Sequence, residues 1–453
     1  MIEMTLAQAA KILGSNQGPN FDSIYFHGIS IDTRSLQPGN LFIAIKGAAM
    51  DGHDFIQEAQ KKGAVAAIVS KSSENSLMQL QVSDTTLALG QLSAAWRHQF
   101  NIPFVAVTGS NGKTTLKNMI AAIMTAACGG DSHQVLATQG TLNNHWGLPL
   151  TLARLNTKHR YAVIEMGMNH FGEIEYLTKL TQPQVAVITN AAAAHLEGVD
   201  NLAGVARAKA EIFSGLATDG IAVLNRDDAF FTFWREAIAD RHYISFGFHP
   251  DAHVHATLHE TPQIQELTIH TPQGDLDVKL PLLGKHNALN ALAATATAAA
   301  IGIKLDAIKL GLETLTAAKG RLELHTLSNG VKIIDDTYNA NPFSLQAAVN
   351  TLANFSGKKI LVLGDMRELG EEAKSLHHSA GEMIRQAGID FLFTFGDLSQ
   401  NTSQAFGEGA YHFNEQEKLI TALKPFLYNQ TTILVKGSRS MRMEKVVSEL
   451  VGC

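Results

Sequence analysis

Residues 103–119, PFVAVTGSNGKTTLKNM, constrain the fold of this chain more than any other part of the sequence. The apolar run at 104–107 predicts a buried strand, and the glycines that follow predict a tight turn that opens a helix. Gly109 and Gly112 allow the backbone of such a turn to approach a ligand closely. A strand, a glycine turn and a helix in this order predict an α/β fold with a ligand at the turn.

The chemistry of this turn predicts a site for a nucleotide phosphate. A helix N-terminus offers unpaired N–H groups and a partial positive charge, which favour an anion. Lys113 adds a mobile positive charge, and Thr114 and Thr115 add hydroxyls that can reach Mg²⁺. The pattern is a shorter P-loop, T-G-x-x-G-K-T, because Val107 stands where the standard pattern has glycine. An ordinary glycine turn with an exposed lysine is the alternative.

Short apolar runs followed by turns and helical patterns recur along the chain, as in YAVIEMG, VAVITN, KILVLGD and TILVKGS. This alternation predicts parallel sheets with helices on both faces and ligands at the carboxyl ends of the strands. Composition shifts near 85 and 315–320 predict domains at 1–85, 86–315 and 316–453. Within the second, residues 245–285 have the alternating pattern of antiparallel strands, and 288–303 read as a buried alanine-rich helix.

Composition excludes several classes of protein. The 453 residues carry 36 Lys and Arg against 42 Asp and Glu, so the net charge of −6 does not favour nucleic acid or an acidic membrane surface. Cys128 and Cys453 cannot make a disulfide framework and suit a reducing compartment. The N-terminus lacks the pattern of a signal peptide, and no run of 18 apolar residues occurs. We expect a cytoplasmic protein without membrane insertion.

Three polar residues of the second predicted domain are candidates for chemistry. Glu165 ends the strand YAVIEMG, where a carboxylate can reach the metal ion that Thr114 binds. His195 follows the strand VAVIT, although a lone histidine can also be structural. Lys209 lies on a predicted helix with apolar faces, and its alternative is a solvated lysine.

Further candidates lie on both sides of the boundary near 315–320. Asn287 and Asn290 are one helical turn apart and share a face, although Asn287 alone could cap the helix. Arg321 could reach a phosphate or pair with a nearby carboxylate. Asp335 and Asp336 end the strand VKII, where two acids are costly without a ligand or a cation, and this favours a function.

The motifs SIDTR, DGHDF, TGSNGKTT, TLNNHWGLPLTL, NAAAAHLEG, GKHNALNAL, KGRLE, DDTYNANP, GDMRELG and LVKGSRS occur in this order between residues 30 and 440. Together they resemble the Mur ligases of bacterial cell-wall synthesis. The P-loop and HNALNA are similar throughout that family and in folylpolyglutamate synthases. TLNNHWG, NAAAAHLEG and DDTYNAN resemble the branch that adds D-alanyl-D-alanine.

The resemblance implies three α/β domains: an N-terminal one for a UDP substrate, a central P-loop ATPase with a parallel sheet, and a C-terminal Rossmann-like one. It also implies a reaction in which a carboxylate of UDP-N-acetylmuramoyl-tripeptide attacks the γ-phosphate of ATP. The amine of D-alanyl-D-alanine then attacks the acyl phosphate. Two Mg²⁺ ions and cationic side chains would offset the negative charge of the phosphates during the reaction.

The resemblance also assigns roles to residues. It implies that catalysis depends on Lys113, Glu165, His195 and Lys209. For metal binding it implies Thr114 and Glu165 at one Mg²⁺, His195 at a second, and carbamylation of Lys209. For ATP it implies contacts with Thr108, Gly109, Ser110, Asn111, Gly112, Lys113, Thr114, Thr115, Asn287 and Asn290, with Arg321 at the phosphates and Asp336 at the ribose. For the other substrates it implies contacts with Ser30, Thr33, Arg34, Asn143, Asn144, Tyr338 and Asn339.

Three other functions stay open at this point. A folylpolyglutamate synthase is an ATP-dependent amide ligase of similar architecture, but it needs no uridine-binding domain before the P-loop. A P-loop switch or kinase would need no second Rossmann-like domain. An inactive binding homologue would not need Lys113, Glu165, His195 and Lys209 together. The third residue of the tripeptide, meso-diaminopimelate or L-lysine, also stays open, and we expect a monomer.

Overall fold

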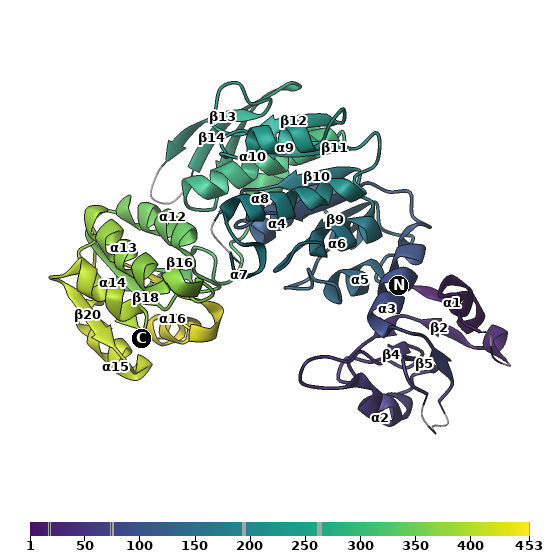
Figure 1. Ribbon diagram of the computed structural model, residues 1–453. Helices are drawn as coiled ribbons and strands as arrows, with labels where there is room; N and C mark the ends of the chain where they lie inside the picture. The colour runs from purple at the N-terminus through teal and green to yellow at the C-terminus, as the bar shows by residue number, and fades with distance from the viewer. Residues whose placement is uncertain are drawn as a thin grey trace.

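The computed structural model describes residues 1–16, 18, 20–72, 74, 77–192, 196–260 and 265–452. Figure 1 shows three α/β parts, with the N-terminal part and the C-terminal part at opposite ends of the central one. No helix in these residues has the length and apolar character needed to cross a membrane.

The N-terminal part is built on a small parallel sheet. Its strands follow the order β3-β4-β5-β6, and β1 and β2 form a separate antiparallel pair. Its elements are β1 (Glu3–Thr5), α1 (Leu6–Ile12), β2 (Tyr25–His27), β3 (Ile29–Ser30), β4 (Leu41–Ile43), α2 (Ile56–Lys61), β5 (Ala66–Val69) and β6 (Gln79–Gln81). Helix α3 (Thr85–Arg97) leads from this part into the central one.

The central part has a six-stranded sheet, all parallel, in the order β12-β11-β10-β7-β9-β8. Its strands are β7 (Phe104–Thr108), β8 (Val135–Ala137), β9 (Tyr161–Glu165), β10 (Val185–Ile188), β11 (Ile221–Asn225) and β12 (His242–Phe246). Its helices are α4 (Lys113–Ala127), α5 (Gly147–Leu152), α6 (Glu173–Thr181), α7 (Leu196–Val199), α8 (Leu202–Ala210), α9 (Phe231–Ala237), α10 (Lys285–Ala300) and α11 (Leu305–Glu313).

The predicted antiparallel region is confirmed in part. β13 (His255–Glu260), β14 (Gln265–Thr271) and β15 (Gly274–Leu280) form a three-stranded antiparallel sheet. The residues at 245–246, however, end β12, which pairs in parallel with β11. The alternating pattern alone could not separate an edge strand of the large sheet from the strands that follow.

The C-terminal part has a second six-stranded sheet, in the order β16-β17-β21-β18-β19-β20. All of its pairs are parallel except β16 with β17. Its elements are β16 (Glu323–Thr326), β17 (Lys332–Asp336), α12 (Pro342–Ala353), β18 (Lys358–Gly364), α13 (Ala373–Gln386), β19 (Phe391–Phe395), α14 (Ser399–Phe406), β20 (Ala410–Phe413), α15 (Gln416–Leu423), β21 (Thr431–Lys436) and α16 (Glu444–Val451).

The two faces of the central sheet belong to different cores. Phe104 and Ala106 of β7 pack into a core that extends into the N-terminal part through Trp96 of α3. Val105 and Val107, which point to the other face, pack with α4 and α10. The Trp96 indole also donates a hydrogen bond to the carbonyl of Leu155 at 3.1 Å. The N-terminal part is therefore fixed to the central part, and the C-terminal sheet has its own two cores.

Candidate active site

The turn after β7 has the backbone that its two glycines predict. Gly109 has φ +147°, and a Cβ at this position would lie 1.7 Å from Thr189 Oγ1. Gly112 has φ +81°, and a Cβ there would lie 2.7 Å from Asn290 Oδ1. Helix α4 begins directly afterwards, at Lys113. Any other residue at these two glycines would strain the backbone and displace a neighbour, so the tight strand–turn–helix requires them.

A cavity of about 560 Å³ opens at this turn, at the carboxyl ends of the central strands. This volume lies within the range of about 300–1,000 Å³ that is typical of small-molecule sites. The structure brings fourteen of the residues singled out above into its lining: Ser110, Asn111, Gly112, Lys113, Thr114, Thr115, Asn143, Glu165, Asn287, Asn290, Arg321, Asp336, Tyr338 and Asn339. They come from both the central and the C-terminal part.

Several candidates do not line this cavity. Thr108 is buried behind the turn, and its hydroxyl donates to the carbonyl of Met166. The Asn144 side chain accepts hydrogen bonds from the backbone of Trp146 and Gly147 at the start of α5. His195 lies outside the described residues.

Glu165 has the features of a metal ligand. Its side chain is buried, and Asn143 Nδ2 donates to Oε1 at 2.8 Å. The other oxygen, Oε2, is buried and has no hydrogen-bond partner in the described part of the chain. A buried, unpaired carboxylate oxygen is costly unless a cation satisfies it. Hard oxygen donors such as Glu165 and Thr114 suit Mg²⁺, so these residues fit the ion that the P-loop motif predicts.

Lys113 lies against the loop that precedes its helix. Its Nζ donates to the carbonyls of Gly109 at 2.7 Å and Ser110 at 3.3 Å. Burial lowers the pKa of Lys113, the charge of Glu165 raises it, and Arg321 lowers it. A phosphate in the cavity would offer this ammonium a stronger acceptor than the two carbonyls do.

Lys209 is buried on α8, with only 2% of the residue exposed. This excludes the alternative of a solvated lysine. Burial sets the pKa of Lys209 well below its ordinary value, and the neighbouring charge of Lys113 lowers it further. Two cationic groups next to each other in a buried site favour a neutral amine at Lys209.

Asn287 and Asn290 share the cavity-facing side of α10. Asn290 Nδ2 donates to Asn287 Oδ1 at 3.4 Å, and Asn287 Nδ2 donates to the carbonyl of Leu283 at 2.7 Å. The N-cap of α10 is Gly284, so the alternative in which Asn287 only caps the helix does not hold.

Two hydrogen bonds connect the C-terminal part to the P-loop turn. Arg321 Nη2 donates to Thr114 Oγ1 at 3.2 Å, and its guanidinium carbon lies 4.0 Å from the centre of the Tyr338 ring. Asn341 Nδ2 donates to Asn111 Oδ1 at 2.9 Å. Both bonds place C-terminal side chains against the P-loop turn.

The cavity also contains groups that the sequence analysis missed, among them His286, Asn341, Arg367 and Lys436. Lys436 Nζ donates to Asp336 Oδ2 at 2.6 Å. Burial lowers the pKa of His286 to about 4, with a smaller contribution from the charge of Lys436, so this imidazole is neutral at pH 7. Burial likewise raises the pKa of Asp336, against the lowering effect of Lys436. The strand end TILVK indicates that Lys436 can lie at a ligand site, but nothing in the sequence predicts its ion pair with Asp336.

The N-terminal candidates lie apart from this cavity. Ser30 and Thr33 are buried, and the Ser30 hydroxyl donates to the backbone carbonyl of Asp32 at 2.9 Å. Arg34 has a side chain 84% exposed and an ion pair with Asp32 at 2.7 Å. Hydrogen bonds from Arg34 lower the pKa of Asp32. The Arg34 guanidinium is thus paired with the Asp32 carboxylate in this structure.

The fold and the site define a P-loop nucleotide-binding protein whose cleft is completed by a second α/β domain. Family models match the chain along most of its length: "Mur ligase family, catalytic domain" at 25–97, "Mur ligase middle domain" at 107–298 and "Mur ligase, glutamate ligase domain" at 320–439. The chain belongs to the Mur ligase family.

Individual relatives agree with this assignment. The UDP-N-acetylmuramoyl-tripeptide–D-alanyl-D-alanine ligase of Escherichia coli (strain K12) is 46% identical, and the alignment covers 99% of each chain. A crystal structure of MurF from Acinetobacter baumannii has a TM-score of 0.93 at 35% identity, with 100% of both chains covered. The MurF ligase from Thermotoga maritima in complex with ADP has a TM-score of 0.84 at 27% identity, covering 94% of this chain and 97% of that one.

Proposed function

We propose that this protein joins D-alanyl-D-alanine to UDP-N-acetylmuramoyl-tripeptide with the energy of ATP, and so supplies UDP-N-acetylmuramoyl-pentapeptide for peptidoglycan synthesis. The near full-length relatives carry the name of this ligase. The observation that carries the proposal is the cavity itself. It joins the P-loop, a buried carboxylate with a free oxygen, and cationic side chains from a second domain.

ATP would lie with its phosphates on the turn at residues 110–115. The backbone N–H groups at the start of α4 and the Lys113 ammonium would contact the phosphates. Asn287 and Asn290 would lie on the adenine side, and Asp336 would contact the ribose. Thr114 and Glu165 would hold one Mg²⁺ and His195 a second, and these ions would offset negative charge on the phosphates.

The reaction proceeds in two displacements. An oxygen of the tripeptide carboxylate attacks the γ-phosphorus, the bond to the β-phosphate oxygen breaks, and ADP leaves with the electron pair. The amine of D-alanyl-D-alanine then attacks the acyl carbon, inorganic phosphate leaves, and the amine loses a proton. Lys113 and Arg321 would stabilise the charge on the transferring phosphoryl group from opposite sides of the cleft.

Lys209 would act as a carbamate. Its depressed pKa leaves a neutral amine, which can attack the carbon of CO₂ and release one proton. The product is an anionic oxygen ligand in place of an ammonium. The exchange would remove the repulsion between Lys209 and Lys113, and it suits a buried position beside a metal site.

The other substrates would contact both end domains. Ser30, Thr33 and Arg34 would meet the uridine diphosphate, with Asn143 and Asn144 near the sugar end. Tyr338 and Asn339 would border the dipeptide, in line with their place in the cavity wall. We also propose that the domains are residues 1–85, 86–315 and 316–453, that the protein is a monomer, and that it is cytoplasmic.

A coupled assay for ADP release tests this function. We expect rapid release only when ATP, Mg²⁺, UDP-N-acetylmuramoyl-tripeptide and D-alanyl-D-alanine are all present. Release without the dipeptide at the same rate would instead indicate an ATP-hydrolysing switch. Release that requires a folate and glutamate would indicate a folylpolyglutamate synthase.

A further inference from the structure

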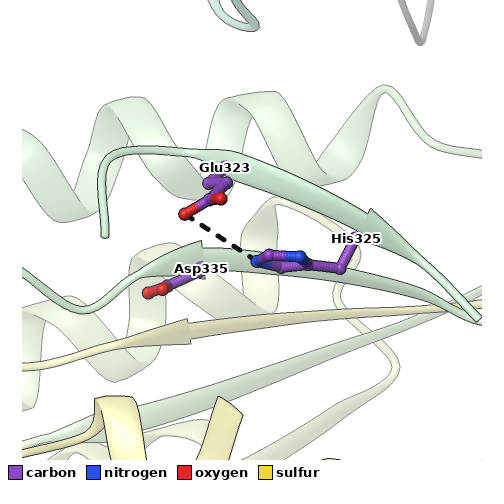
Figure 2. Close-up of side chains that lie close together, drawn as sticks. All are labelled: Glu323, His325 and Asp335. Atoms are coloured by element: carbon purple, nitrogen blue, oxygen red, sulfur yellow. Dashed lines mark ion pairs between the residues drawn. The ribbon is translucent and has the colours of Figure 1, made fainter. Parts of the chain in front are cut away.

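We propose that Glu323, His325 and Asp335 form a binding site for a divalent transition metal of the Zn²⁺ class, outside the nucleotide cleft. The cluster lies on the edge of the C-terminal sheet, where β16 pairs with β17. Figure 2 shows Glu323 and His325 on one strand and Asp335 on the next. This site goes beyond the ligase function proposed above and does not depend on it.

Strand geometry brings the three side chains together. Glu323 and His325 are two residues apart on β16 and therefore project from the same face. Asp335 on β17 is the direct cross-strand partner of Glu323. One ligand atom from each residue lies within 4.8 Å of the others. Neighbours of this kind have Cβ atoms about 4.5–5.5 Å apart, so their side chains can reach a common ion.

The present distances are close to those of a metal site. Glu323 Oε2 lies 3.8 Å from His325 Nε2. Two ligands of one tetrahedral ion are about 3.4 Å apart, because the metal–ligand bonds are about 2.1 Å long. Small side-chain rotations would bring all three ligands to this spacing. Glu323 and His325 are only half-buried, so they have room to rotate.

The surroundings of Asp335 also favour a bound cation. The residue is 3% exposed, and its Oδ1 accepts hydrogen bonds from the Thr337 backbone at 3.1 Å and the Thr337 hydroxyl at 2.6 Å. Its other oxygen has neither a hydrogen bond nor an ion pair with any residue that the structure describes. This oxygen is therefore available to a cation, and the same ion could contact Glu323 and His325.

The ligand types identify the class of ion. An imidazole nitrogen with two carboxylates suits Zn²⁺, Co²⁺ or Mn²⁺, whereas Mg²⁺ and Ca²⁺ prefer oxygen ligands alone. Three protein ligands leave a position for water, and the half-buried edge gives the ion access. The ion that serves ATP and the ion in this cluster would therefore be chemically distinct.

The cluster lies next to two residues that reach the nucleotide cleft. Asp336 follows Asp335 and points to the opposite face of β17, where it pairs with Lys436. Arg321 precedes β16 by two residues and contacts Thr114. A metal ion between β16 and β17 would fasten together the strands beside both residues, and it would stabilise the part of the C-terminal sheet that reaches the P-loop.

Metal titration of the full-length protein tests the site. The chelator-treated protein would be titrated with Co²⁺ in excess Mg²⁺ and followed by the visible absorption of bound Co²⁺. We expect one equivalent to bind, and His325→Ala and Asp335→Asn each to weaken this binding at least tenfold. His378→Ala removes an exposed histidine of the same domain and should bind Co²⁺ as the wild type does.

Thermal unfolding gives a second measurement, which does not depend on the spectrum. Zn²⁺ should raise the melting temperature of the wild type and of His378→Ala, but not that of His325→Ala. His325 lies half-exposed on an edge strand, so its variant should fold even if Asp335→Asn does not. The proposal is overturned if the wild type binds no equivalent of Co²⁺, or if His325→Ala binds it with unchanged affinity.

Discussion

Arg321 of the C-terminal domain donates a hydrogen bond to Thr114 of the P-loop, 207 residues earlier in the chain, at 3.2 Å. In this structure the second domain therefore touches the hydroxyl that would bind Mg²⁺. The Tyr338 ring lies 4.0 Å from the guanidinium carbon and supports it from behind. The central and the C-terminal domain therefore both contribute side chains to the proposed nucleotide site.

We expect Arg321→Ala to raise KM for ATP and to lower kcat, with kcat/KM falling about tenfold to a hundredfold. A charge-assisted hydrogen bond contributes about 1.5–3 kcal/mol, and this one would act on phosphate oxygens whose charge grows in the transition state. Steady-state kinetics with ATP as the varied substrate checks this. Lys319→Ala, at an exposed position two residues earlier, is the control and should leave both constants unchanged.

Lys113→Ala should abolish ligation without unfolding the protein. The ammonium that now contacts the carbonyls of Gly109 and Ser110 is the group best placed to meet the γ-phosphate. Loss of such a group lowers kcat by about a hundredfold or more. The measurement is turnover of a variant whose circular dichroism matches the wild type, and near-normal turnover would refute the nucleotide site.

Lys209→Ala should be nearly inactive and should regain part of its activity with added formate or acetate. The short carboxylate would replace the oxygen ligand that the carbamate supplies. The exposed Lys179→Ala is the control, and its activity should not respond to either salt. Full activity of Lys209→Ala without additives, or an intact mass that shows no carbamate under CO₂-rich conditions, would count against carbamylation.

Arg34→Ala should raise KM for the UDP substrate about tenfold or more, and leave KM for ATP and for D-alanyl-D-alanine almost unchanged. To bind the substrate, the guanidinium must exchange the carboxylate of Asp32 for a diphosphate or a uracil carbonyl. Kinetics with each substrate varied in turn checks this. If none of the three constants changes, Arg34 is only a surface partner of Asp32.

The half-buried His286 should make stability depend on pH. Its pKa of about 4 in the folded protein is below its ordinary value of about 6.5, so the unfolded chain binds a proton that the folded chain does not. The contribution of His286 to stability is complete above about pH 6.5 and decreases as the pH falls towards 4. Denaturant unfolding at both ends of this window should show a smaller loss of stability for His286→Gln than for the wild type. His378→Gln, at an exposed position, should behave as the wild type does.

The P-loop could be predicted from the sequence because its signals are local. The apolar run, the two glycines and Lys113 are consecutive, and the structure confirms strand β7, the turn and helix α4. The alternation of apolar runs and turns likewise predicted parallel sheets, which both six-stranded sheets confirm apart from the antiparallel β16. Strand order could not be predicted, since it depends on crossovers such as the one that places β21 between β17 and β18.

The rest of the site depends on contacts between distant segments. Lys436 and Asp336 form an ion pair across 100 residues, and only the adjacent pairing of β17 and β21 brings them together. His286 looks like any helix residue in the sequence, and its shifted pKa arises from burial in a cavity between domains. The resemblance to Mur ligases supplied Arg321 and Asp336, for which the local sequence left several roles open.

Mass spectrometry of the reaction product tests the central claim most directly. The purified protein would be incubated with ATP, Mg²⁺, UDP-N-acetylmuramoyl-tripeptide and D-alanyl-D-alanine, with Lys113→Ala as a parallel sample. The account predicts UDP-N-acetylmuramoyl-pentapeptide with one ADP and one phosphate for each product molecule, and no product from the variant. Consumption of ATP without the pentapeptide, or pentapeptide from Lys113→Ala at the wild-type rate, would contradict it.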